Sequence, residues 1–109
     1  MHLYQLRVVI QENKLDEFID SLRFLSKEIR EEQGCIDFSF HCDLENKNVY
    51  TLLGKWKTSQ AMEDHFKREK FSVLMGAAKV LGEDYKMSIG KTVDIGRPNI
   101  FSETAPIVP

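Results

Sequence analysis

The stretch WKTSQAMEDHFKREKF, residues 56–71, places a histidine among apolar side chains at helical spacing. Read as a helix, it puts Ala61, Met62, His65 and Phe66 on one side and the charged residues on the other. A neutral imidazole in a cleft titrates at roughly pH 6.5, which suits it to take a proton from a phenol or a carbon acid. His65 is therefore the candidate catalytic residue. A half-buried histidine that only bonds to a helix carbonyl is the alternative.

Two residues near His65 could assist it. Glu69 follows His65 by four residues and could fix the imidazole tautomer if the helix continues unbroken. Trp56, at the end of a predicted strand, offers a flat apolar wall for a planar ligand, or else packs in the core. The other predicted substrate contacts are large apolar or aromatic side chains, with core packing as their alternative role; they are Phe38, Phe40, Tyr50, Leu52 and Met62.

The sequence lacks the patterns of several other site chemistries. Its three histidines have no metal-ligand spacing, and the chain has no phosphate-binding glycine loop or nucleophile elbow. We therefore expect no metal, nucleotide or other cofactor. His41 alternates onto the opposite sheet face with Arg7 and Asp37, where an inter-subunit polar contact is favoured over a metal site. A cofactor-free reaction would draw its electrons from the substrate, while the protein supplies a base, orientation and a dry pocket.

Size and composition indicate one ordinary globular domain. The chain has 109 residues and a net charge of −2, which gives no reason to expect nucleic acid or an anionic membrane as partner. No apolar run approaches the ~20 residues of a membrane helix, and the N-terminus does not read as a signal peptide. Cys35 and Cys42 lie seven residues apart in one predicted strand and so on opposite faces, too far apart to pair. Reduced thiols predict a cytoplasmic protein.

Periodicity predicts the element order β-α-β-β-α-β. Strands are predicted over residues 3–11, 35–43 and 49–56 and from residue 85 onward. Asn13 could cap the first helix, which ends before Gly34. Thr58 or Ser59 could cap the second, which either runs on to Gly82 or kinks near residues 68–71. The predicted domain covers residues 1–96, and residues 97–109 form an extended tail with three prolines.

This order predicts an α+β, ferredoxin-like fold. Its antiparallel four-stranded sheet would have the helices on one face and the first and third strands in the centre. The other face would carry Leu3, Val9 and Leu53 among polar residues. That mixture is too apolar for water and too polar for a monomer's core. We therefore predict a homodimer that stacks two sheets face to face.

Residues 31–71 resemble the central segment of the antibiotic biosynthesis monooxygenase (ABM) family of dimeric α+β barrel proteins. The shared pattern is Glu-x-Gly-Cys before an aromatic strand, an aromatic residue that ends the next hairpin strand, and a Ser-x-x-Ala helix start followed by His-Phe. The residues that carry it are Glu32, Gly34, Cys35, Phe38, Trp56, Ser59, His65 and Phe66. The likeness covers residues 3–95.

The resemblance implies a ligand held between sheet and helices in each subunit. Leu52 and Met62 stand where the polyketide oxygenases of the family have Asn and Tyr. Met75 stands near the haem-binding His of the haem degraders, so haem is disfavoured. The quinol-monooxygenase-like and signal-degrading branches, which share the helix His, fit best. The first of these implies a cofactor-independent oxidoreductase for a small phenolic or quinol-like molecule. The alternatives are an isomerase or degradative enzyme for a small carbonyl signalling compound, and a non-catalytic small-ligand-binding dimer.

Overall fold

The computed structural model describes residues 1–96, so the predicted tail at 97–109 lies outside the described residues. The predicted β-α-β-β-α-β order is confirmed, with the second helix divided in two. The elements in chain order are β1 (His2–Ile10), the short 3-10 turn η1 (Glu12–Lys14), α1 (Leu15–Arg30), β2 (Cys35–Cys42), β3 (Val49–Trp56), α2 (Ser59–Phe66), α3 (Glu69–Leu81) and β4 (Gly82–Lys91).

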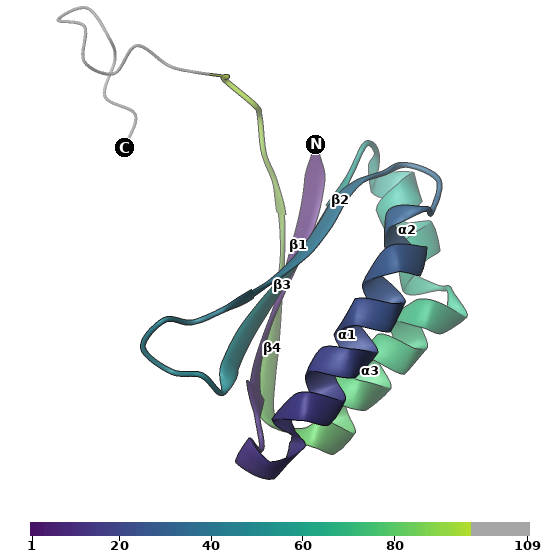
Figure 1. Cartoon of the computed structure of the whole chain (residues 1–109). Coiled ribbons are helices and arrows are strands. Elements are labelled where there is room, and N and C mark those ends of the chain that lie inside the picture. The colour runs from purple at the N-terminus through teal and green to yellow at the C-terminus, as the bar shows by residue number, and fades with distance from the viewer. Residues whose placement is uncertain (97–109) are drawn as a thin grey trace, which may run out of the picture.

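The four strands form one antiparallel sheet in the order β2-β3-β1-β4. β1 and β3 occupy the centre, as the sequence predicts. In their register Tyr4 lies opposite Gly54, and Leu6 lies opposite Leu52. Figure 1 shows α1, α2 and α3 together on one face of this sheet, while no helix or strand of residues 1–96 covers the other face. The architecture is the predicted ferredoxin-like α+β fold.

The core lies between the sheet and the helices. Alternate residues of β1 and β3 point toward the helices and are buried, including Tyr4, Leu6 and Trp56 at 0% exposure. α1 contributes a stripe spaced by three or four residues, because only that face of an amphipathic helix meets the sheet. The buried apolar members of this stripe are Phe18, Leu22, Leu25 and Ile29.

Two local predictions are wrong. The pairing of β2 with β3 shifts register between Cys35 and Asp37, so the strict alternation expected along β2 breaks there. Ile36 is consequently 45% exposed, and Cys35 moves to the helix side, where it packs against the core. Asn13 makes no cap, because it lies inside η1 and α1 begins after Lys14.

The open face of the sheet carries the mixed surface that the sequence predicts. Leu3, Val9 and Leu53 are partly exposed there. His41 shares this face, and its Nε2 lies 2.8 Å from the Ser39 hydroxyl. Within residues 1–96, the second face of the sheet is therefore a partly apolar surface.

Candidate functional site

His65 lies on the inner side of α2 and is completely buried. Thr58 sets the start of this helix, because its side-chain oxygen accepts a hydrogen bond from the Ala61 backbone N–H at 3.1 Å. Seven residues after Thr58, the imidazole of His65 points into the layer between helix and sheet, and its exposed fraction is 0%. The predicted position in the apolar face of the helix is thus confirmed.

Both ring nitrogens of His65 have hydrogen-bond partners. Nδ1 lies 2.7 Å from Oε2 of Glu32, and Nε2 lies 2.8 Å from the Tyr4 hydroxyl. Burial lowers the pKa of His65 below its ordinary value, although the Glu32 carboxylate opposes this effect. Burial, reinforced by Glu32, raises the pKa of Tyr4, so the phenol keeps its proton. A carboxylate can only accept, so neutral His65 donates from Nδ1 to Glu32 and accepts the Tyr4 proton at Nε2.

Glu32 is held by the turn between α1 and β2. Its backbone N–H donates to the Ile29 carbonyl, and its own carbonyl accepts from the Cys35 N–H, each at 3.1 Å. Gly34 in this turn has φ +83°, and a Cβ there would lie 2.5 Å from that of Ala61. Glycine therefore both permits the turn and lets α2 approach it. This close contact brings the Glu32 carboxylate to His65.

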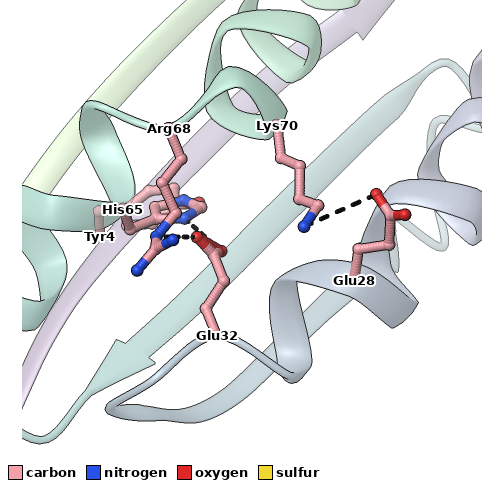
Figure 2. Close-up of polar contacts among 6 residues, drawn as sticks. All are labelled: Tyr4, Glu28, Glu32, His65, Arg68 and Lys70. Atoms are coloured by element: carbon pink, nitrogen blue, oxygen red, sulfur yellow. Dashed lines mark hydrogen bonds and ion pairs between the residues drawn. The ribbon is translucent and has the colours of Figure 1, made fainter.

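Arg68 extends the cluster to the surface. It precedes α3 at the break between the two helices, and its backbone N–H donates to the His65 carbonyl at 3.0 Å. Its Nε lies 2.9 Å from Oε1 of Glu32 without the alignment of a hydrogen bond. Figure 2 shows a chain of contacts in which Arg68 meets Glu32, Glu32 meets His65, and His65 meets Tyr4. Lys70 and Glu28 form a separate pair at 4.0 Å.

Aromatic rings surround the imidazole. The indole of Trp56 stacks on it with ring centroids 4.5 Å apart, and Phe71 lies edge-on at 5.3 Å. The Trp56 Nε1 atom is buried and has no hydrogen-bond partner. A Cβ added at Gly54 would lie 2.7 Å from the Tyr4 ring and 3.2 Å from Trp56 Nε1. The absence of a side chain at Gly54 therefore leaves room for both rings.

The sequence-predicted contacts divide between this cluster and the rest of the core. Trp56 touches His65, and Met62 is buried one helical turn before it. Phe38 lies beside the cluster, because it pairs with Gly54 on the neighbouring strand. The other three predicted contacts lie further along the sheet; they are Phe40, Tyr50 and Leu52. Tyr50 is six residues from Trp56, about 20 Å along an extended strand.

Sequence reasoning missed three members of the cluster and misassigned one. Glu69 does not fix the tautomer, because the helix breaks before it and Glu32 occupies Nδ1. By its sequence position Arg68 is expected to be a solvated helix residue, and Tyr4 an ordinary strand residue. The sequence points to Glu32 only through the family pattern. Its signal was a carboxylate next to the turn glycine that meets the His65 helix.

Two surface pockets lie near the helices, and neither is lined by His65 or Trp56. One of about 390 Å³ adjoins Arg68, and one of about 430 Å³ lies between α1 and α3. Within residues 1–96, no three His, Cys, Asp or Glu side chains gather as a metal site would require. Over the same residues, no helix has the length and apolarity to span a membrane.

Comparison with known proteins gives a family match over most of the chain. The family model for antibiotic biosynthesis monooxygenases matches residues 1–76, which include the whole of the cluster around His65. A search of curated proteins finds no match. The family assignment therefore rests on the match to the family model.

Solved structures resemble the chain in fold. A candidate antibiotic biosynthesis monooxygenase of Deinococcus radiodurans matches with a TM-score of 0.78 and 19% identity, covering 89% of this chain and 100% of that one. Another, from Nitrosomonas europaea, matches with a TM-score of 0.79 and 14% identity, covering 86% of this chain and 100% of that one. A conserved protein of Methanosarcina mazei Go1 matches with a TM-score of 0.78 and 21% identity, covering 85% of this chain and 94% of that one. At these identities the likeness shows the fold alone.

Proposed function

This chain belongs to the antibiotic biosynthesis monooxygenase family, and we propose that it oxygenates a small phenolic or quinol-like molecule without a cofactor. In this proposal His65 is the base, Glu32 sets its tautomer, and Trp56 is the wall against which a planar substrate stacks. The substrate lies in the layer between the sheet and the α2–α3 junction.

The observation that supports this proposal is that buried polar atoms without a hydrogen-bond partner lie on residues next to His65. In residues 1–96, the buried side-chain atoms without a hydrogen-bond partner are Trp56 Nε1 and Glu32 Oε1, and of these Glu32 Oε1 is in an ion pair with Arg68 at 2.9 Å. Both residues contact His65 directly. An unpaired buried polar group costs about 1–3 kcal/mol, so the unpaired Trp56 Nε1 calls for a partner such as a ligand or a water. A substrate oxygen that accepts from the indole N–H would remove this cost at Trp56.

The Tyr4 hydroxyl indicates what His65 can bind. A phenol already donates to Nε2 at 2.8 Å, and a phenolic substrate would take this place when the Tyr4 ring turns aside. Nε2 removes the substrate proton, and Glu32 stabilises the imidazolium that forms. The resulting anion can reduce dioxygen: a hydroquinone plus O₂ gives a hydroxyquinone plus water, with all electrons drawn from the substrate. The surrounding aromatic rings keep water out during this step.

The substrate enters at the break between α2 and α3. Phe66 and Phe71 flank this break, are only partly buried and contact each other with ring centroids 4.9 Å apart. Their movement would open the layer above Tyr4 and His65 while the sheet stays in place. Helix ends and short connections are the usual places for such opening.

Oxygen uptake with a panel of hydroquinones tests the proposal. His65→Gln should lower the rate about 10²-fold or more, the usual effect of removing a general base. Glu31→Gln, an exposed carboxylate beside Glu32, is the matched control and should leave the rate unchanged. An equal rate in wild type and His65→Gln would refute the role of His65. Substrate loss without oxygen uptake would favour the isomerase alternative.

Complete burial of His65 favours a second candidate function. Its exposed fraction is 0% and both ring nitrogens are already bonded, as in a histidine that serves packing. The protein would then be a non-catalytic dimer that binds a small hydrophobic ligand. Crystals soaked with small aromatics separate the two: a ligand bound away from Nε2, with no turnover in solution, supports this second function.

We also propose that the open sheet face forms a homodimer. Leu3, Val9 and Leu53 remain partly exposed on this face, and a second copy would cover them. Light scattering at micromolar concentration should give twice the chain mass. Leu53→Lys should shift it to the monomer, while Gln5→Lys, opposite Leu53 in the register and already polar, should shift it less. A monomeric wild type would contradict the proposal.

A further inference from the structure

The pocket of about 390 Å³ lies outside the His65 cluster, between the α1–β2 turn and the start of α2. Its size suits a small ligand. It opens to solvent, in contrast to the sealed layer around the imidazole. The residues that line it are mostly polar or charged; they are Gln33, Gly34, Lys57, Thr58, Gln60, Ala61, Asp64 and Arg68.

Two cationic side chains line this pocket and could hold an anion. Lys57 and Arg68 are positively charged, Asp64 is negatively charged, and the buried Glu32 carboxylate lies 2.9 Å from Arg68 Nε and offsets part of its charge. Asp64 is partly satisfied, because its Oδ1 accepts a hydrogen bond from the Gln60 side chain at 2.9 Å. The two cations flank α2 and line the same pocket, so a bound anion could contact both. Arg and Lys are the residues that most often hold phosphate and carboxylate groups.

Arg68 has hydrogen-bonding capacity left for such a ligand. Its side chain is 49% exposed, and its contact with Glu32 is a charge contact at 2.9 Å that lacks hydrogen-bond alignment. A guanidinium carries five N–H donors, so this contact leaves most of them unused. We propose that the pocket binds a small oxyanion, a phosphate- or carboxylate-bearing molecule, through Arg68 and Lys57.

The site is coupled to His65 through Glu32. Glu32 contacts Arg68 with one carboxylate oxygen and His65 with the other. The titratable or charged groups that face His65 are Tyr4 from β1, Glu32 from the α1–β2 turn and Arg68 from the helix junction, whereas β3 and α3 present Trp56 and Phe71. An anion that neutralises Arg68 leaves Glu32 free to stabilise the imidazolium. Oxyanion binding therefore raises the proton affinity of His65.

Two spectroscopic probes lie at the ends of this chain of contacts. The Nε–H of Arg68 gives an NMR signal that reports directly on an anion in the pocket. Trp56, the single tryptophan, stacks on His65 at 4.5 Å, so its fluorescence is sensitive to the charge on the ring. The experiment titrates the protein at pH 6 with inorganic phosphate, and separately with succinate, exchanging each for chloride at constant ionic strength. It requires no turnover, so its result is independent of the proposed oxygenase activity.

The expected result is a saturable shift of the Arg68 signal together with quenching of Trp56. Lys57→Gln should weaken binding about fivefold or more and Arg68→Gln should weaken it similarly. Lys67→Gln removes the same charge from an exposed side chain outside the pocket and should change binding less than twofold. Response to one anion and not the other identifies the ligand's chemical group.

Three outcomes would overturn the proposal. One is a response that follows ionic strength without saturating for either anion. Another is equal weakening by Lys57→Gln and Lys67→Gln, which would indicate only a general field effect. A third is saturable binding with no change at Trp56, which would remove the coupling to His65. Within residues 1–96, the ion-pair partners of Glu32 are His65 and Arg68 and not Lys57, so Lys57→Gln remains informative if Arg68→Gln fails to fold.

Discussion

Removal of the Glu32 carboxylate should destabilise the protein far more than its position after a helix would indicate. The side chain is 3% exposed and contacts both His65 and Arg68. Glu32→Ala leaves the Nδ1–H of a buried imidazole without an acceptor, which costs about 1–3 kcal/mol. It also leaves a small cavity, worth about 1 kcal/mol more. We expect a loss of about 2–4 kcal/mol in the free energy of unfolding.

Two further variants divide this loss into its causes. Glu32→Gln keeps the shape and an acceptor oxygen but not the charge, so it should cost only about 1–2 kcal/mol, the difference between a charge-assisted and a neutral hydrogen bond. Glu31→Ala removes an exposed carboxylate from the adjacent position and should stay within about 0.5 kcal/mol. Urea unfolding followed by Trp56 fluorescence measures all three, at one fixed protein concentration because a dimer would make stability concentration-dependent.

The pH dependence of the same variants gives an independent check. The pKa of His65 is lowered by burial in the folded protein, so the unfolded chain binds this proton first as the pH falls. Stability should therefore be level above about pH 6.5 and decline below it, by at most about 1.4 kcal/mol per pH unit for this one group. Glu32→Gln removes the charge that opposes the lowering, so its decline should extend to lower pH.

Either of two results would refute this reasoning. If Glu32→Ala unfolds at the same urea concentration as Glu31→Ala, the carboxylate does not hold the imidazole in place. If Glu32→Gln is as damaging as Glu32→Ala, the acceptor oxygen contributes nothing and the loss has another cause. Wild-type stability that is level through pH 5 would contradict the buried neutral state of His65.

Two further predictions concern packing and thiol reactivity. Gly54→Ala should cost about 1–3 kcal/mol in the free energy of unfolding by overpacking, because the new Cβ would lie 2.7 Å from the Tyr4 ring. Gly76→Ala, whose new Cβ has nothing within 4 Å, should stabilise α3 by about 0.5–1 kcal/mol. Thermal unfolding measures both variants, and equal effects would exclude the steric cause. Burial raises the pKa of Cys35 to about 11, whereas Cys42 is exposed, so iodoacetamide at pH 8 should label Cys42 first by mass spectrometry. Preferential labelling of Cys35 would contradict its packed position.

The sequence predicts the elements of this fold well because their signals are local. β3 is found with its observed bounds, since alternating apolar residues lie between a polar turn and a helix cap. Thr58 is confirmed as the cap of α2 for the same reason. The bulge at Ile36 is not found, because it depends on how β2 pairs with β3 and not on the residues of β2 alone.

The candidate site is only partly predictable because its contacts are distant in sequence. His65 and Trp56 lie nine residues apart, and helical and strand spacing were enough to place them together. Tyr4 and Glu32 lie 61 and 33 residues from His65. Their approach depends on the sheet order and on the tight contact of Gly34 with α2. No periodicity in the sequence contains that information, so the sequence favours a nearer carboxylate, Glu69, instead.

β1 is synthesised before both of its hydrogen-bonding partners, the strands that begin at Val49 and Gly82. A growing chain shorter than these positions therefore carries an apolar strand with both edges free. Such a strand pairs readily with other chains. We expect nascent fragments of this protein to need chaperone protection until β4 has emerged, and truncations before β4 to aggregate in the cell.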